Sequence, residues 1–132
     1  MIPSTAQVAA LIPQRFHGEA PSALTVPTAA QISDLIEQRA VDVRNKCGDV
    51  DRAVGELDSD DGDALEDLAR NTIALLVASY IESSFYPEQQ GSDGASAVFL
   101  RIRAEEHVRL LRRQVRMVRY ATRPQLEYPV DV

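Results

Sequence analysis

Apolar residues recur at helical spacing in four segments of the chain, and nowhere do apolar and polar residues alternate over the length of a strand in a way that would argue for a sheet. The first segment starts at Ser4, a candidate N-cap, and predicts a short helix to about Ile12, where Pro13 ends it. Residues 13–27 contain three prolines and Gly18, so we expect an extended loop there.

The second helix carries the clearest start signal in the chain. Thr28 and Gln31 form a capping box, in which each side chain accepts a hydrogen bond from the backbone N–H of the other residue. Apolar residues at helical spacing follow, and Gly48 is a suitable C-terminal cap. The apolar positions are Ile32, Leu35, Ile36, Ala40 and Val43. This pattern predicts an amphipathic helix that packs by one stripe.

An acidic stretch separates this helix from the third one. Residues 49–62 include Gly62 and predict a solvated loop, with a short helical turn around residues 52–57. The third helix should start at about Asp63 and end at about Ser84. It is apolar on more than one face, which favours a central position in the fold. The apolar residues are Leu65, Leu68, Ile73, Leu75, Leu76, Val77, Tyr80 and Ile81.

The rest of the chain predicts a long helix between two irregular segments. Residues 88–94 are polar and contain no core residue, so we expect a mobile connection. A fourth helix over residues 95–121 would be about 40 Å long, and part of it should project from the domain. Residues 122–132 contain two prolines and alternating apolar residues, which predicts an extended tail that adds to a neighbour. The fold class is therefore all-α, a small helical bundle over residues 1–121 with a long C-terminal helix, followed by this interaction tail.

Charge is distributed unevenly along the chain, although the net charge of −6 is moderate. Between residues 49 and 67 nine acids stand against the single base Arg52. Between residues 101 and 123 the balance reverses, with eight arginines against Glu105 and Glu106. Such asymmetry marks surfaces that meet a charged partner, which can be a protein, nucleic acid or another copy of the chain.

Composition narrows the class of protein further. The chain has 45% apolar and 26% charged residues, as globular proteins do. Its longest apolar run, residues 73–78, is far shorter than the roughly 18 residues that a membrane span needs, so we expect no membrane contact. The start of the chain lacks a secretory signal, and Cys47 is the single cysteine, so we expect a structural thiol and synthesis in a reducing, intracellular setting.

The sequence offers no catalytic or metal-binding constellation. It has no glycine-rich phosphate loop, no Gly-x-Ser-x-Gly and no Cys-x-x-Cys, and His17 and His107 stand in different segments without further ligands nearby. The stretch from Asp58 superficially resembles a calcium loop, but its sixth residue is Asp63 where glycine belongs, and its twelfth is Ala69 where glutamate belongs. We therefore expect a solvated capping loop, and a protein with no enzymatic activity, no metal and no cofactor.

The arginine-rich last helix is the feature that bears most on function. Guanidinium groups bind carboxylates or phosphates, so an acidic protein surface or nucleic acid could meet them. They could also form a solvated face whose aliphatic stems cover the core. The acidic net charge and the lack of interleaved aromatic residues argue against a dedicated DNA reader, and we favour a protein interface in which the arginines meet acids of another subunit. A small helical nucleic-acid-binding or regulatory protein that uses this helix is the alternative.

The order of the segments adds a family resemblance. A short helix (Ser4–Ile12) precedes an amphipathic helix with a proline start (Val26–Ile36), a central apolar helix that ends in Tyr80–Pro87, and the long arginine-rich helix. In order, length and composition together, this arrangement resembles the head-to-tail adaptor proteins of long-tailed bacteriophages, over most of the chain.

The resemblance implies a structural protein of the virion neck, synthesised in the host cytoplasm. Such adaptors assemble as a ring, typically a dodecamer, beneath the portal protein. The ring extends the channel through which DNA passes without sequence-specific binding, and it offers a docking surface to a downstream tail or head-completion protein. No catalytic residue carries over. The residues that we expect to contact the portal or a neighbouring copy are Arg109, Arg112, Arg113, Arg116 and Arg119 on the last helix and Leu126, Tyr128 and Val130 in the tail.

Overall fold

The computed structural model of the protein describes residues 2–89 and 95–121, and over these residues every regular element is a helix. In chain order they are α1 (Thr5–Ala9), the 3-10 turn η1 (Pro13–Arg15), α2 (Ala29–Cys47), α3 (Val50–Gly55), α4 (Ser59–Phe85), the 3-10 turn η2 (Pro87–Gln89) and α5 (Ala95–Ala121). The all-α class predicted from the sequence is confirmed. The predicted tail at 122–132 and most of the predicted connection at 88–94 lie outside the described residues.

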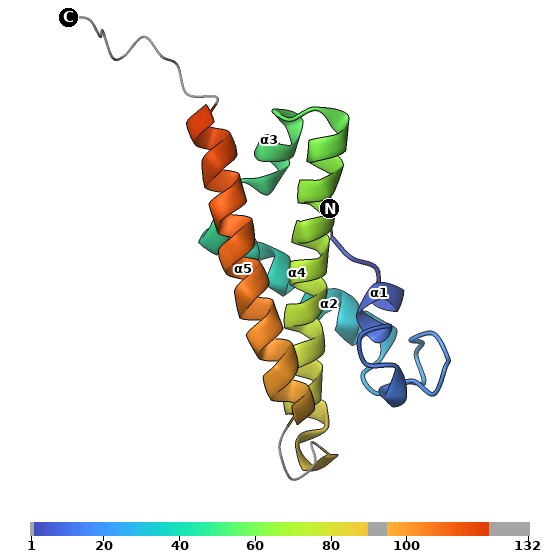
Figure 1. Ribbon diagram of the computed structural model, residues 1–132. Coiled ribbons are helices and arrows are strands. Elements are labelled where there is room, and N and C mark those ends of the chain that lie inside the picture. The colour runs from blue at the N-terminus through green and yellow to red at the C-terminus, as the bar shows by residue number, and fades with distance from the viewer. Residues whose placement is uncertain (1, 90–94, 122–132) are drawn as a thin grey trace, which may run out of the picture.

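Two long helices form the frame of the molecule. α4 and α5 have 27 residues each and run antiparallel, side by side (Figure 1). The short helix α3 lies beside the N-terminal end of α4 and the C-terminal end of α5, and α2 crosses both long helices. Because α4 contacts each of the other four α-helices, it is the central helix that its apolar faces predicted.

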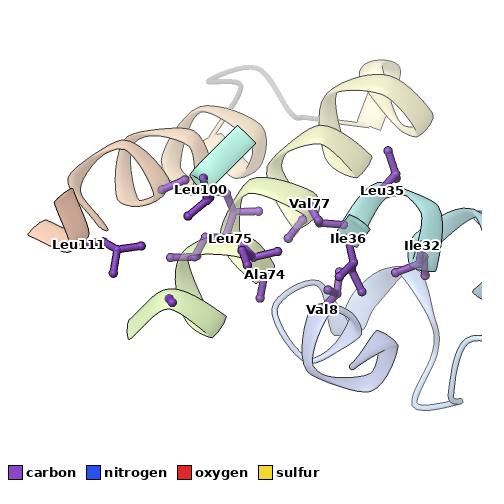
Figure 2. Close-up of a cluster of buried hydrophobic side chains, with 14 of the residues drawn as sticks. Val8, Ile32, Leu35, Ile36, Ala74, Leu75, Val77, Leu100 and Leu111 are labelled. Carbon is purple, nitrogen blue, oxygen red and sulfur yellow. The ribbon is translucent and has the colours of Figure 1, made fainter. Parts of the chain in front are cut away.

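The core lies on both sides of α4. Figure 2 shows Leu100 and Leu111 of α5 on one side of this helix, and side chains of α1 and α2 on the other. Those on the α1 and α2 side are Val8, Ile32, Leu35 and Ile36. The residues of α4 between them have positions that differ by three or four, so that buried side chains repeat along the helix. They include Leu65, Ala69, Ile73, Val77 and Ile81.

Local capping signals fix where the helices begin and end. The Thr28 hydroxyl accepts from the backbone N–H of Gln31 at 3.2 Å, and the Gln31 side chain accepts from the backbone N–H of Thr28 at 2.9 Å, as predicted. Ser4 and Gln7 form a second capping box at the start of α1. Gly48 caps α2 with φ +97°, a conformation that suits glycine, and its N–H donates to the carbonyl of Arg44.

Three predicted boundaries were wrong, and for two of them a capping side chain is the cause. α4 begins at Ser59, four residues earlier than expected, because Asp58 caps it by accepting from the N–H of Asp61 at 2.8 Å. Gly62 therefore lies inside the helix, where a Cβ would stand only 3.2 Å from the carbonyl oxygen of Val54. This glycine permits close packing of α3 on α4 and does not end an element.

The other two differences concern the N-terminal part of the chain and α3. α1 ends at Ala9, and the following turns lead into η1, so residues 13–27 are not extended throughout. α3 spans Val50–Gly55, slightly earlier than the predicted turn, because the Asp49 side chain accepts from the N–H of Arg52 and starts a helix there.

The sequence predicted that part of α5 projects from the domain, and the structure shows α5 packed on the bundle as far as Val118. Leu111 and Val115 are completely buried, and Val118 packs against the core. The reason is that α4 is as long as α5, while α2 and α3 cover the side of α5 that carries these residues. The C-terminal half of α5 is consequently a supported helix with one inner and one outer face.

Candidate functional site

The five candidate arginines of α5 stand on its exposed sides. Leu111 and Val115 are four residues apart, so both point to the side of the helix that packs on the bundle. The arginines fall between and beside these positions and are all exposed: Arg109, Arg112, Arg113, Arg116 and Arg119. Packing of the inner face therefore presents the arginines to the outside.

Four of these arginines surround an open depression of about 570 Å³, which they line together with two apolar side chains. The described residues of the lining are Arg109, Arg112, Arg113, Arg116, Met117 and Tyr120, and we call these six residues the arginine surface. Met117 is 62% and Tyr120 is 76% exposed. Arginine, tyrosine and methionine are enriched where proteins meet other proteins, because they combine large contact area with charge or polarity.

The described part of the chain does not neutralise the charges of the arginine surface. Within residues 2–89 and 95–121, none of its four guanidinium groups forms an ion pair. Arginines elsewhere do, as in the pair of Arg39 with Asp42 at 2.8 Å. The sequence explains part of this difference, since no acid stands three or four positions from Arg112, Arg113 or Arg116, the spacing at which ion pairs form on a helix.

Arg119, the fifth candidate, has a different environment. Its Nη1 lies 3.9 Å from the position that a Cβ would take on Gly48, the C-cap of α2. A cation at this place faces the carbonyl end of α2, where the helix dipole is negative. Arg119 therefore contributes to the contact between α2 and α5, and it does not line the depression.

The structure does not place the other three candidate residues. Leu126, Tyr128 and Val130 lie outside the described residues, so their predicted role in docking stays a prediction. The binding chemistry that can be described here is that of the arginine surface alone. Guanidinium groups form paired hydrogen bonds with carboxylates and phosphates, so this surface can hold either kind of group.

Sequence reasoning missed a buried polar cluster at the end of α4. Glu82 is completely buried and accepts from Nε of Arg15 at 2.6 Å, from Nη2 of Arg15 at 3.1 Å and from the Gln14 side chain at 3.4 Å. The Arg15 guanidinium also lies 4.4 Å from the ring centroid of Tyr86, and the Tyr86 hydroxyl donates to the carbonyl of Val26. These contacts hold the segment between α1 and α2 on α4.

The electrostatics of this cluster favour the charged pair. Hydrogen bonding to Glu82 raises the pKa of Arg15, and burial, which acts in the opposite direction, only partly offsets it. One signal in the sequence could have found the pair. Glu82 directly follows the buried Ile81 and stands four residues after the buried Ala78, so a helical projection already predicts a carboxylate on a core face that needs a cation.

Other residues with reactive side chains have structural surroundings. Cys47 is buried and its thiol donates to the carbonyl of Val108 at 3.6 Å; burial raises the pKa of this thiol, which Arg112 and Lys46 partly counteract. His107 is half-buried, with Nδ1 2.8 Å from the carbonyl oxygen of Arg103 on its own helix. In the described part of the chain, no three His, Cys, Asp or Glu side chains gather in a way that could hold a metal ion.

Comparison with family models, with curated proteins and with solved structures gives no match to this chain. None of the described helices combines the length and the apolar character needed to cross a membrane.

Proposed function

We propose that this protein is a head-to-tail connector of a bacteriophage particle, a structural component of the neck without enzymatic activity. The observation that carries the proposal is the arginine surface, because a 27-residue helix fixed in the bundle presents four exposed guanidinium groups that lack ion pairs within the described chain. Together with the order of segments noted above, this arrangement favours a protein whose task is to bind other protein subunits.

In this function the chain forms a ring beneath the portal protein, through which DNA passes without being read. The arginine surface contacts the portal or a neighbouring copy, and Leu126, Tyr128 and Val130 of the tail add further contacts. A downstream tail or head-completion protein docks on the assembled ring. The packing of α5 on α4 supports this task, since a helix already formed and fixed in the bundle needs no ordering of its backbone on binding.

Gentle affinity purification from the native source tests the proposal. A tagged copy should recover a ring-shaped portal or tail protein in fixed stoichiometry, and electron microscopy should show the tagged chain as a ring on that assembly. A matched tagged variant with Arg113→Glu and Arg116→Glu should recover less of the partner. Recovery of nucleic acid, or of nothing larger than a dimer, would contradict the connector function.

The tail provides a second and independent test. Removal of residues 122–132 should leave the domain folded, because the described core lies entirely within residues 2–121, but it should abolish docking to the portal or neck. Circular dichroism and thermal unfolding check the fold, and the same purification checks docking. Normal docking of the truncated chain would remove the tail from the set of contact residues.

The exposed guanidinium groups also favour a second candidate, a small nucleic-acid-binding or regulatory protein that uses α5. In that case duplex DNA should bind at low salt, and the logarithm of the binding constant should fall linearly with the logarithm of the salt concentration. Substitution of Arg113 and Arg116 by alanine should flatten this slope, whereas the same change at Arg52, an α3 residue that already pairs with Glu56, should not. Absence of binding at low ionic strength would eliminate this candidate.

A further inference from the structure

The nine acids between residues 49 and 67 fall into two groups in the structure. Four of them form ion pairs within the chain: Asp49 with Arg44, Glu56 with Arg52, and Glu66 and Asp67 with Arg70. The other five are exposed and form no ion pair among the residues described: Asp51, Asp58, Asp60, Asp61 and Asp63. We call these five residues the acidic corner, because they lie where α3 turns into α4.

The acidic corner has a fixed shape. The Asp58 side chain accepts from the backbone N–H of Asp61, and the close approach of Gly62 to Val54 holds the start of α4 against α3. The carboxylates are consequently presented by two packed helices and by the turn between them. A preorganised charged surface of this kind recognises a partner with less loss of conformational entropy than a flexible loop does.

The acidic corner and the arginine surface do not neutralise each other within one molecule. The C-terminal end of α5 lies beside α3 and the start of α4 (Figure 1), but Leu111 and Val115 occupy the side of α5 that packs on the bundle. The four arginines stand on the other sides of that helix, and no ion pair joins them to the corner among the described residues. Among the described residues these arginines have no carboxylate partner, and a second molecule can supply one.

The geometry points to a second copy of this chain as the occupant of the arginine surface, which binds the acidic corner of that copy. The charges match, since four guanidinium groups would meet five carboxylates, and Met117 and Tyr120 supply apolar area between them. The inference deepens the proposed function and rests on it, because a ring needs a contact of this kind between neighbours.

This contact has a definite symmetry. In the ring of the proposed function, each copy uses its arginine surface toward one neighbour and its acidic corner toward the other. Such a heterologous contact generates a ring if the rotation closes, or a filament if it does not, whereas a two-fold dimer would pair the two surfaces reciprocally between the same two copies. Association should therefore continue beyond the dimer.

Charge reversal on purified chains tests the contact. The variant with Arg113→Glu and Arg116→Glu and the variant with Asp60→Arg and Asp61→Arg should each self-associate at least about tenfold more weakly than the unchanged chain, because like charges then face each other. Carrying all four substitutions in one chain should restore association, since each glutamate then meets an arginine of the next copy. Native mass spectrometry or analytical ultracentrifugation measures the oligomers.

Matched controls separate this contact from general charge effects. Arg101→Glu reverses an exposed arginine of α5 outside the depression, and Asp34→Arg reverses an exposed acid of α2 outside the corner, so both should associate normally. The salt dependence of the unchanged chain is a further control, because it does not depend on the folding of any variant. Raising the salt from about 0.1 M to about 1 M shortens the screening length from about 10 Å to about 3 Å, and should dissociate the oligomer.

Each outcome bears on one of the two proposals. A chain that stays monomeric at low salt, or a four-substitution variant that fails to recover while remaining folded, would overturn the head-to-tail contact. Rings that follow the charge rules but recover no portal or tail protein from the native source would leave the contact standing and overturn the connector function. Recovery of a portal by a chain that never self-associates would overturn the head-to-tail contact and leave the connector function standing.

Discussion

Arg15 and the arginines of α5 use the same side chain in opposite ways. Arg15 lies against a completely buried carboxylate and over an aromatic ring, so its charge is satisfied within the fold. Arg109, Arg112, Arg113 and Arg116 are exposed and form no ion pair in the described chain. The comparison teaches that an arginine count alone does not identify an interface. What distinguishes the two regions is whether the bundle already supplies the carboxylate.

The two regions should also differ in how they respond to substitution. A buried ion pair that loses one partner leaves a charge without compensation in a low-dielectric site, which is strongly destabilising. Substitution of an exposed arginine removes little more than contacts with water, so the fold should keep its stability. Substitutions at Arg15 or Glu82 should therefore lower the free energy of unfolding. Substitutions at the α5 arginines should instead lower the affinity for a partner.

The largest effect is expected from Glu82→Ala. This change leaves the Arg15 guanidinium beside an empty and buried site, so it should lower the free energy of unfolding by about 3–5 kcal/mol in urea denaturation. The double variant Arg15→Met with Glu82→Leu is the control, because two apolar side chains leave no charge behind and should recover most of the loss. A single Glu82→Ala variant as stable as the unchanged chain would show that the pair is not buried in solution.

A slightly smaller effect should distinguish the inner and outer faces of α5. Leu111 is completely buried, and Leu110 beside it is 40% exposed. Leu111→Ala should cost about 2–5 kcal/mol of unfolding free energy through lost burial and the cavity that it leaves. Leu110→Ala should cost clearly less than half as much, and equal losses at both positions would mean that α5 is rotated from the orientation described here.

The comparison also marks what the sequence could and could not predict. Thr28 and Gln31 predicted the start of α2, and the apolar faces of α4 predicted its central place, because both signals are local and repeat with the helical period. The role of Gly62 could not be predicted, since it depends on Val54 of another helix. The exposure of the α5 arginines followed from the pattern. The position of Arg119 near Gly48 could not be predicted from the pattern, because it depends on how α2 crosses α5.

Replacement of arginine by lysine sharpens the comparison at an intermediate scale. Arg15→Lys keeps the charge but loses the paired hydrogen bonds to Glu82 and the stacking on Tyr86, so it should cost about 1–3 kcal/mol. Arg113→Lys should leave stability unchanged.

The raised pKa of Arg15 means that the stabilisation by the pair is fully present through the neutral range and is lost only as strongly alkaline pH approaches that pKa. The stability difference between the unchanged chain and Glu82→Ala should persist over this range, and its earlier loss on alkaline titration would contradict the assignment.

The smallest effect on stability is expected at the arginine surface. An unchanged free energy of unfolding there would show that these arginines do not serve the fold. Arg113→Ala and Arg116→Ala should each change the free energy of unfolding by less than about 0.5 kcal/mol, because each side chain is exposed and forms no ion pair within the described fold. The same two changes should weaken association with a second copy, whereas Arg101→Ala should alter neither quantity. Destabilisation of the monomer by the surface variants would mean that these arginines serve the fold, as Arg15 does. The two regions would then not differ in function.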